Sequence, residues 1–210
     1  MIILNDEQGS EAWLRSRLGK ISASRVDSLI TPTGKPSAQS DKYINELIAQ
    51  RLSGEVPETY TNAHMERGNE LEPSARALYE LISDCTVDLA GFCLHPDLPA
   101  GFSPDAFVFT EGGLEGGLEV KCPAPHTHVE YLRKGKVPSK YYPQIQMALW
   151  ISEKTKWWDF MSYHPKMEPL IVRVERDEEY IEKLSQAVTN AAKIIDDEVE
   201  RLAPTKEEVK

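Results

Sequence analysis

The chain has 210 residues, of which 40% are hydrophobic, and a formal net charge of −10 at pH 7. This length suits a single α/β domain with a substantial core. No apolar run approaches the length of a membrane span, and the first residues lack the pattern of a signal peptide, so we expect a cytoplasmic protein without membrane contact. Three unpatterned cysteines argue against a disulfide framework and against a zinc or iron–sulfur cluster.

The first 54 residues predict a mostly helical segment. Amphipathic stretches follow an irregular start, and serines precede them at capping positions. The loop before the last helix carries Lys35 as its only charge, and it is either a surface connection or an arch over a substrate. We expect an arm over 1–10, a helix over 11–18, a helix capped by Ser22 or Ser24, a loop over 31–39 and a helix over 40–54.

A longer helix is predicted over 62–82, because its apolar residues fall on one face. Pro73 lies inside this pattern, and its ring removes one helical hydrogen bond and clashes with the preceding turn. We therefore expect a kink or a fresh start at Pro73, which turns Glu72 out of the regular surface row.

Strands are predicted over 86–95, 100–110 and 114–122, with Gly112, Gly113, Gly116 and Gly117 as turn signals. A helix over 141–152, strands over 157–163 and 170–175, and a helix over 177–202 complete the chain. His126 and His128 fall on a predicted loop without a third ligand, so we expect both to be solvent-exposed.

The strands over 100–110 and 114–122 form the hairpin on which the functional prediction depends. Antiparallel pairing places Asp105 beside Glu119, and alternation sends Glu119 and Lys121 to one face and the Val120 side chain to the other. Carboxylates with a backbone carbonyl suit Mg²⁺, and a neighbouring lysine can orient a water or take its proton. The group is either a solvated surface or a site for phosphodiester hydrolysis, and its apolar flanks favour the site.

Several segments together carry a family resemblance. Pro104 and Asp105, followed by Glu119, Val120 and Lys121, match the PD-(D/E)xK nuclease signature. With the segments 13–24, 68–76, 103–105, 118–123 and 144–146, residues 11–180 resemble the phage lambda exonuclease family of viral recombination nucleases.

The resemblance implies one nuclease domain over 1–210, with the α/β restriction-endonuclease-like core of that superfamily and a mixed central sheet flanked by helices. In this scheme helices within 11–54 form a channel and a 5′-phosphate site, residues 61–175 form the core, and 177–202 is a final helix.

Site residues also follow from the resemblance. Asp105, Glu119 and the Val120 carbonyl are expected to hold one Mg²⁺, with Asp105 bridging to a second and Mn²⁺ able to substitute. Lys121 positions the attacking water. The remaining assignments are Glu72 and Gln146 in the active site, Arg17, Ser24, Ser103 and Gln146 around the terminal 5′-phosphate, and Met65 as a wedge at the DNA end.

Each of these assignments has a plainer alternative. Glu72 and Arg17 are otherwise surface charges, and Ser24 is otherwise only a helix cap. Met65 is otherwise a core residue. Gln144 and Gln146 lie on an otherwise apolar helix, so their amides need partners, which are either structural groups or a phosphate or metal-bound water.

The function implied is a Mg²⁺-dependent, processive 5′→3′ exonuclease on double-stranded DNA ends, which leaves 3′ overhangs for recombination by strand annealing. A ring-shaped homotrimer, a single-strand annealing protein as partner, and a phage or prophage origin in a bacterial host cell are implied as well. The alternatives are a structure-specific endonuclease and a catalytically silent DNA-end-binding scaffold; intact Asp105, Glu119 and Lys121 argue against the scaffold.

A net charge of −10 is unfavourable for binding DNA, which needs cations opposite its phosphates. Residues 174–210 contain eleven acidic and six basic side chains, so about half of the excess lies in this segment. Basic clusters occur elsewhere, and we expect them to line a positive channel. They are Arg15, Arg17, Lys20 and Arg25, and Arg133, Lys134, Lys136 and Lys140.

Overall fold

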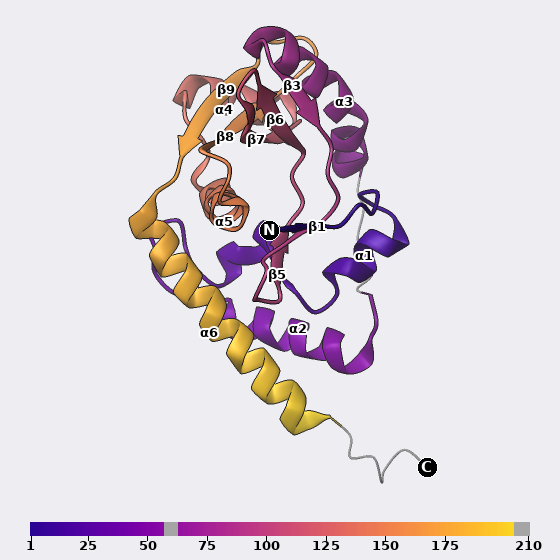
Figure 1. The fold of residues 1–210 in the computed structure, drawn as a ribbon. Coiled ribbons are helices and arrows are strands. Elements are labelled where there is room, and N and C mark those ends of the chain that lie inside the picture. The colour runs from indigo at the N-terminus through magenta and orange to yellow at the C-terminus, as the bar shows by residue number, and fades with distance from the viewer. Residues whose placement is uncertain (57–62, 204–210) are drawn as a thin grey trace.

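The computed structural model describes residues 1–56 and 63–203 (Figure 1). At its centre is a five-stranded mixed sheet of order β3-β6-β7-β8-β9, in which β7 is antiparallel to β6 and parallel to β8. The mixed α/β sheet with flanking helices is therefore confirmed. Its strands are β3 (Thr86–Asp88), β6 (Ala106–Thr110), β7 (Gly113–Lys121), β8 (Trp157–Ser162) and β9 (Leu170–Glu175).

A second, smaller sheet was not predicted. It has the order β1-β4-β5-β2, and its strands are β1 (Ile2–Ile3), β4 (Cys93–Leu94), β5 (Ala100–Phe102) and β2 (Ile21–Ser22). The strands predicted over 86–95 and 100–110 are each divided between the two sheets. Pro104 explains the second division, because a residue without a backbone N–H cannot continue a sheet ladder. Residues 103–105 thus carry the chain from the small sheet into the large one.

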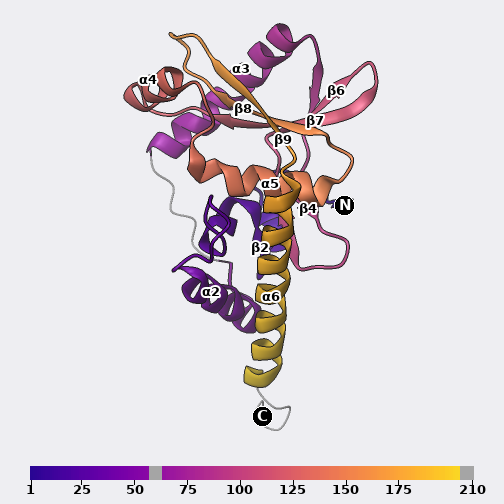
Figure 2. The same cartoon turned by 90° about the vertical axis from the view of Figure 1, so that its left-hand side faces the viewer.

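Helices cover both faces of the large sheet (Figures 1 and 2). On one face, Ala75 and Tyr79 of α3 pack with Leu118 and Val120 of β7. On the other, Ile145 and Leu149 of α5 belong to the larger core. The helices are α1 (Glu11–Arg17), α2 (Ser40–Ser53), α3 (Ala63–Ser83), α4 (Pro125–Lys134), α5 (Tyr142–Ser152) and α6 (Glu178–Leu202), with short 3-10 helices η1 (Ala23–Ser28) and η2 (Ser139–Tyr141).

Three helical predictions need correction. The segment predicted as a second full helix is the 3-10 helix η1. Helix α3 continues through Pro73 as one element, so the predicted fresh start does not occur. Helix α4 occupies the segment predicted as a loop, and Pro125 stands at its start, where its missing N–H costs no helical bond.

Gly116 and Gly117 lie inside β7 and pair with Trp157 and Trp158 of β8, so the prediction that they form a turn is wrong. A Cβ added at Gly116 would lie 2.4 Å from the Trp157 ring, and one at Gly117 would lie 2.4 Å from the Trp158 ring. The two glycines therefore leave room for the neighbouring indoles on opposite faces of the sheet.

Replacing Gly117 by alanine is expected to lower the free energy of unfolding by about 1–3 kcal/mol, because the buried Trp158 ring must move to admit the methyl group. The matched control is Gly68→Ala in α3, where, outside the helix's own backbone, no atom of the described residues lies within 4 Å of the added Cβ. That change should stabilise the helix by about 0.5–1 kcal/mol. Urea denaturation of both variants checks the prediction, and equal midpoints would contradict it.

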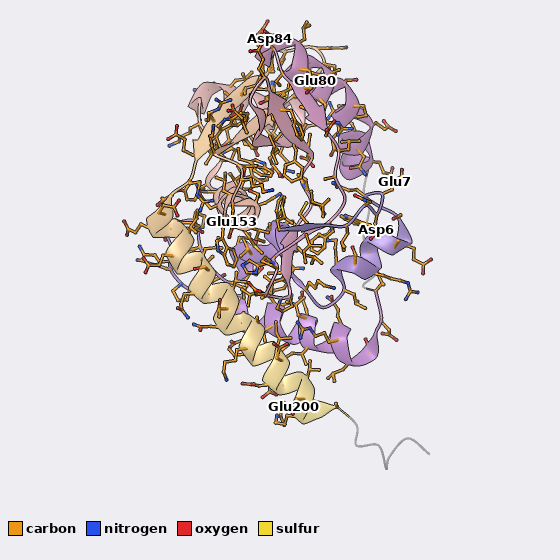
Figure 3. The ribbon with its side chains drawn as sticks, viewed as in Figure 1. Asp6, Glu7, Glu80, Asp84, Glu153 and Glu200 are labelled. Atoms are coloured by element: carbon orange, nitrogen blue, oxygen red, sulfur yellow. The ribbon has the colours of Figure 1, made fainter. Side chains whose placement is uncertain are left out.

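Acidic side chains occur on several parts of the molecule. Figure 3 shows Glu200 near the end of α6, Asp84 and Glu80 near the end of α3, Glu153 near α5, and Asp6 and Glu7 beside α1. Within the described ranges, no helix combines the length and the apolar character needed to cross a membrane.

Candidate active site

The β6–β7 hairpin brings Asp105, Glu119 and Lys121 together, as the alternation of the sequence predicts. Ala106 pairs with Leu118, so Asp105 lies next to Glu119 at the end of the hairpin. The Val120 backbone N–H donates to Asp105 Oδ2 at 2.6 Å, and Lys121 Nζ lies 2.5 Å from Glu119 Oε1. We call Asp105, Glu119 and Lys121 the carboxylate–lysine cluster.

Burial controls the charges of this cluster. Glu119 is only 3% exposed. Its burial raises the pKa of the carboxyl group, which the Lys121 ammonium opposes and the Asp105 carboxylate reinforces. Burial alone would lower the pKa of Lys121, yet Glu119 and Asp105 outweigh it, so that pKa is raised. Without a metal, Lys121 is therefore a cation that can orient a water, and it is not a base.

Gln144, and not Gln146, lies beside the cluster. Gln144 Nε2 donates to Glu119 Oε1 at 2.7 Å. Gln146 is fully buried, where its Nε2 donates to the Glu175 carbonyl at 2.9 Å and its Oε1 accepts from the Asp177 N–H at 3.0 Å. Both ends of the Gln146 amide are thus used for structure. The structure thus brings Gln144 and not Gln146 to Glu119, and the active-site role of Gln146 stays a prediction.

Helix α3 contributes Glu72 near the cluster. Burial raises the pKa of Glu72, and Asp105 raises it further, while Lys121 and Arg76 oppose the shift. Arg76 Nη1 lies 3.5 Å from Glu72 Oε2. These charge effects place Glu72 near Asp105 and Lys121, yet among the described residues it forms no ready metal group with the two carboxylates of the cluster. Met65, the predicted wedge, is in α3, but its side chain lies outside the described part of the chain.

Three of the four residues predicted around the 5′-phosphate, Arg17, Ser24 and Ser103, are joined through Trp13. The indole Nε1 of Trp13 donates to Ser103 Oγ at 3.0 Å, and Arg17 Cζ lies 4.1 Å from the centroid of the Trp13 ring. Arg17 Nη2 in turn donates to Ser24 Oγ at 3.3 Å. We call Trp13, Arg17, Ser24 and Ser103 the arginine pocket. The sequence alone did not single out Trp13, although an aromatic residue four positions before an arginine on a helix is a stacking signal.

The cluster has the donors that a hard divalent cation needs. In residues 1–56 and 63–203, no group of three or more His, Cys, Asp or Glu side chains forms a ready metal centre. Asp105 Oδ1 and Glu119 Oε2 accept no hydrogen bond from the described residues, so one oxygen of each carboxylate is left for a ligand. Two carboxylates suit Mg²⁺, which keeps several waters instead of demanding a full protein cage.

The histidines after β7 take no part in this site. His128 is fully buried in α4, where its Nδ1 lies 2.7 Å from Ser162 Oγ and its Nε2 lies 3.0 Å from the Glu168 carbonyl. The expectation that His128 is solvent-exposed is therefore wrong, whereas His126 is exposed as expected.

A mixed sheet that carries Asp105, Glu119 and Lys121 on its central hairpin has the arrangement of PD-(D/E)xK nucleases. The chain belongs to the YqaJ-like viral recombinase family, whose model matches residues 12–155. The predicted family and the prediction of a nuclease are confirmed. No curated protein matches the chain.

Solved structures agree with this assignment. An alkaline exonuclease from Laribacter hongkongensis, LHK-Exo, is 35% identical with a TM-score of 0.81, over 92% of this chain and 96% of that one. The same enzyme in complex with dAMP aligns over the same shares with a TM-score of 0.80. A phage-related exonuclease from Haemophilus somnus 129PT shares the fold at 17% identity, with a TM-score of 0.66 over 88% of this chain and 96% of that one.

Proposed function

We propose that the protein is a Mg²⁺-dependent exonuclease that enters double-stranded DNA at a 5′-phosphate end and degrades the 5′ strand, leaving a 3′ overhang. The observation that carries the proposal is the connection between the two parts of the site. Ser103 receives the Trp13 hydrogen bond in the arginine pocket, and Asp105 of the carboxylate–lysine cluster follows two residues later. A group that grips an end phosphate therefore adjoins a group suited to cleavage.

Asp105, Glu119 and the Val120 carbonyl would hold the metal ion, and Asp105 would bridge to a second one. Bound divalent ions supply Lewis-acid stabilisation of the phosphate and a water of lowered pKa. The protein supplies the geometry: Gln144 holds the Glu119 carboxylate by a hydrogen bond at 2.7 Å, and the Lys121 ammonium orients the water. Glu72 would add a further carboxylate near Asp105 and Lys121.

We also propose that the active assembly is a ring of three copies that works with a single-strand annealing protein. A single copy with a net charge of −10 should leave DNA quickly, because its overall charge repels phosphates. A ring that encloses the DNA removes this problem by topology, and head-to-tail contacts between copies can close it. Chromatography with light scattering, which gives the mass of the assembly, tests the trimer.

The test of the activity uses linear duplex DNA with 5′-phosphates, labelled at the 5′ end of one sample and at the 3′ end of another. With Mg²⁺, the 5′ label should appear first in mononucleotides, and EDTA should stop the release. A closed circle should remain intact; cleavage of the circle would favour the endonuclease alternative. No hydrolysis of any DNA with Mg²⁺ or Mn²⁺ would refute the proposal and favour the binding scaffold.

Arg17→Ala should remove most of the preference for a 5′-phosphate over a 5′-hydroxyl end. Charge-assisted hydrogen bonds contribute about 1.5–3 kcal/mol, so the ratio of the two initial rates should fall roughly 10- to 100-fold. Arg15→Ala is the matched control, because Arg15 is exposed on the same helix and pairs with Glu11. An unchanged ratio in Arg17→Ala would place the end-phosphate contact elsewhere.

A further inference from the structure

A wide groove lies outside the carboxylate–lysine cluster. It has a volume of about 960 Å³ and runs between α4, the segment that follows α4, and the first turns of α6. Four lysines line it, and we call it the lysine groove. They are Lys134, Lys136, Lys140 and Lys183.

The carboxylates of the groove are already neutralised or hydrogen-bonded. Glu130 pairs with Lys134 at 2.5 Å, and Glu179 pairs with Lys183 at 2.7 Å. Asp177, the third carboxylate, accepts from the Tyr142 hydroxyl at 2.6 Å and from the Tyr180 N–H at 3.0 Å.

Lys136 and Lys140, in contrast, have no carboxylate within salt-bridge distance among the described residues, and both are exposed. With the charge of Asp177 set against these two lysines, the groove keeps a net positive charge, although the protein as a whole is acidic.

Tyr141 connects this charge to the catalytic cluster. The centroid of its ring lies 5.5 Å from Lys121 Nζ and 4.8 Å from Lys140 Nζ. The ring is held in place by stacking on Phe160, with 5.3 Å between the centroids. Lys121 of the cluster and Lys140 of the lysine groove thus lie at the same aromatic ring.

We propose that the lysine groove is a second DNA contact, in which Lys136 and Lys140 bind the phosphate backbone of the substrate beyond the cleaved bond. This inference rests on the proposed nuclease function. Polyanionic DNA is the ligand that two uncompensated ammonium groups beside a nuclease site fit, because each phosphate contact releases a condensed counterion.

The contact is with the backbone and not with the bases. Tyr131 and Tyr180 of the groove are buried, and the half-buried Tyr142 ring already contacts Tyr180, with 5.0 Å between the ring centroids. Lysine ammonium groups bind phosphates as point charges, and phosphate contacts carry no sequence information. Binding in the groove should consequently be independent of sequence and sensitive to salt.

The test compares native protein with the double variant Lys136→Gln, Lys140→Gln. Fluorescence anisotropy in EDTA, which prevents hydrolysis, measures binding of a short blunt duplex and of one of its single strands from about 50 to 200 mM NaCl. The control is Lys42→Gln, Lys193→Gln, which removes the same charge from exposed positions outside the groove. Hydrolysis of linear duplex by the native protein with Mg²⁺ is measured in parallel.

If the groove binds duplex, the plot of log K against log salt should become shallower by about 1.8 in the groove variant, which corresponds to two lost contacts. If it binds the single strand, the loss should be about 1.4 and should occur with that probe. The inference would be overturned if the groove variant had the same slopes as the native protein with both probes. An equal loss of slope in the control variant would also overturn it. If the groove variant keeps the slopes of the native protein while the native protein hydrolyses DNA, the groove contact is refuted and the nuclease function is not.

Discussion

Replacing Asp105 by asparagine should reduce the rate of DNA hydrolysis by about 10³-fold or more without unfolding the protein. Metal ions contribute several kcal/mol of transition-state stabilisation, and about 1.4 kcal/mol corresponds to each factor of ten. Asparagine keeps an oxygen that can accept the Val120 N–H, so the hydrogen bond that closes the hairpin remains. The change therefore removes a charge with little change of shape.

Two measurements make this prediction specific. Calorimetric titration of Mg²⁺ should show weaker binding in Asp105→Asn, and the midpoint of thermal unfolding in EDTA should stay near that of the native protein. Asp88→Asn is the matched control, because Asp88 is exposed on the edge strand β3, and it should retain full activity. Native rates in Asp105→Asn would show that the cluster is not the site of cleavage.

Gln146→Leu should destabilise the protein by about 2–4 kcal/mol, because it leaves the Glu175 carbonyl and the Asp177 N–H without their partner. A buried polar group that loses its hydrogen bond costs about 1–3 kcal/mol. The lost contacts join α5 to the junction between β9 and α6, so the loss should be seen in urea denaturation without DNA. Turnover measured below the unfolding transition should change little.

Gln144→Leu should show the opposite behaviour. Gln144 is partly exposed and its amide bonds only Glu119 among the described residues, so stability should change by less than about 1 kcal/mol. Loss of the hydrogen bond that orients a metal-binding carboxylate should reduce turnover about 10- to 100-fold. A variant pair with these effects exchanged would restore Gln146 to the site.

The sequence predicted the β6–β7 hairpin, α5, β9 and α6 because each has a local pattern of its own. It did not predict the small sheet, whose strands have two or three residues and are fixed by pairing with distant segments. Helix α4 was missed although Pro125 at its start was a usable signal. Gly116 and Gly117 were misassigned, because only the distant Trp157 and Trp158 reveal why a strand lacks side chains there.

The two glutamines show the same limit at the level of the site. Residues two apart on a helix point in directions about 200° apart, so Gln144 and Gln146 cannot both face the cluster. The sequence could show that one of them faces away from the cluster. Which of the two does so depends on the position of β7 on one side of the helix and of β9 on the other. Asp105, Glu119 and Lys121 needed no such information, since strand alternation alone places them together.

Residues 103–105, which carry the chain from the small sheet to the large one, also have a consequence for the size of the product. Ser103 of the arginine pocket and Asp105 of the carboxylate–lysine cluster are two residues apart, so their Cα atoms are at most ~7 Å apart. Under the proposed function this short tether keeps the bound end phosphate close to the bond that is cut, and we expect single nucleotides as the product. Inserting a glycine after Ser103 should therefore make the length of the released product less uniform, so that dinucleotides accompany the single nucleotides.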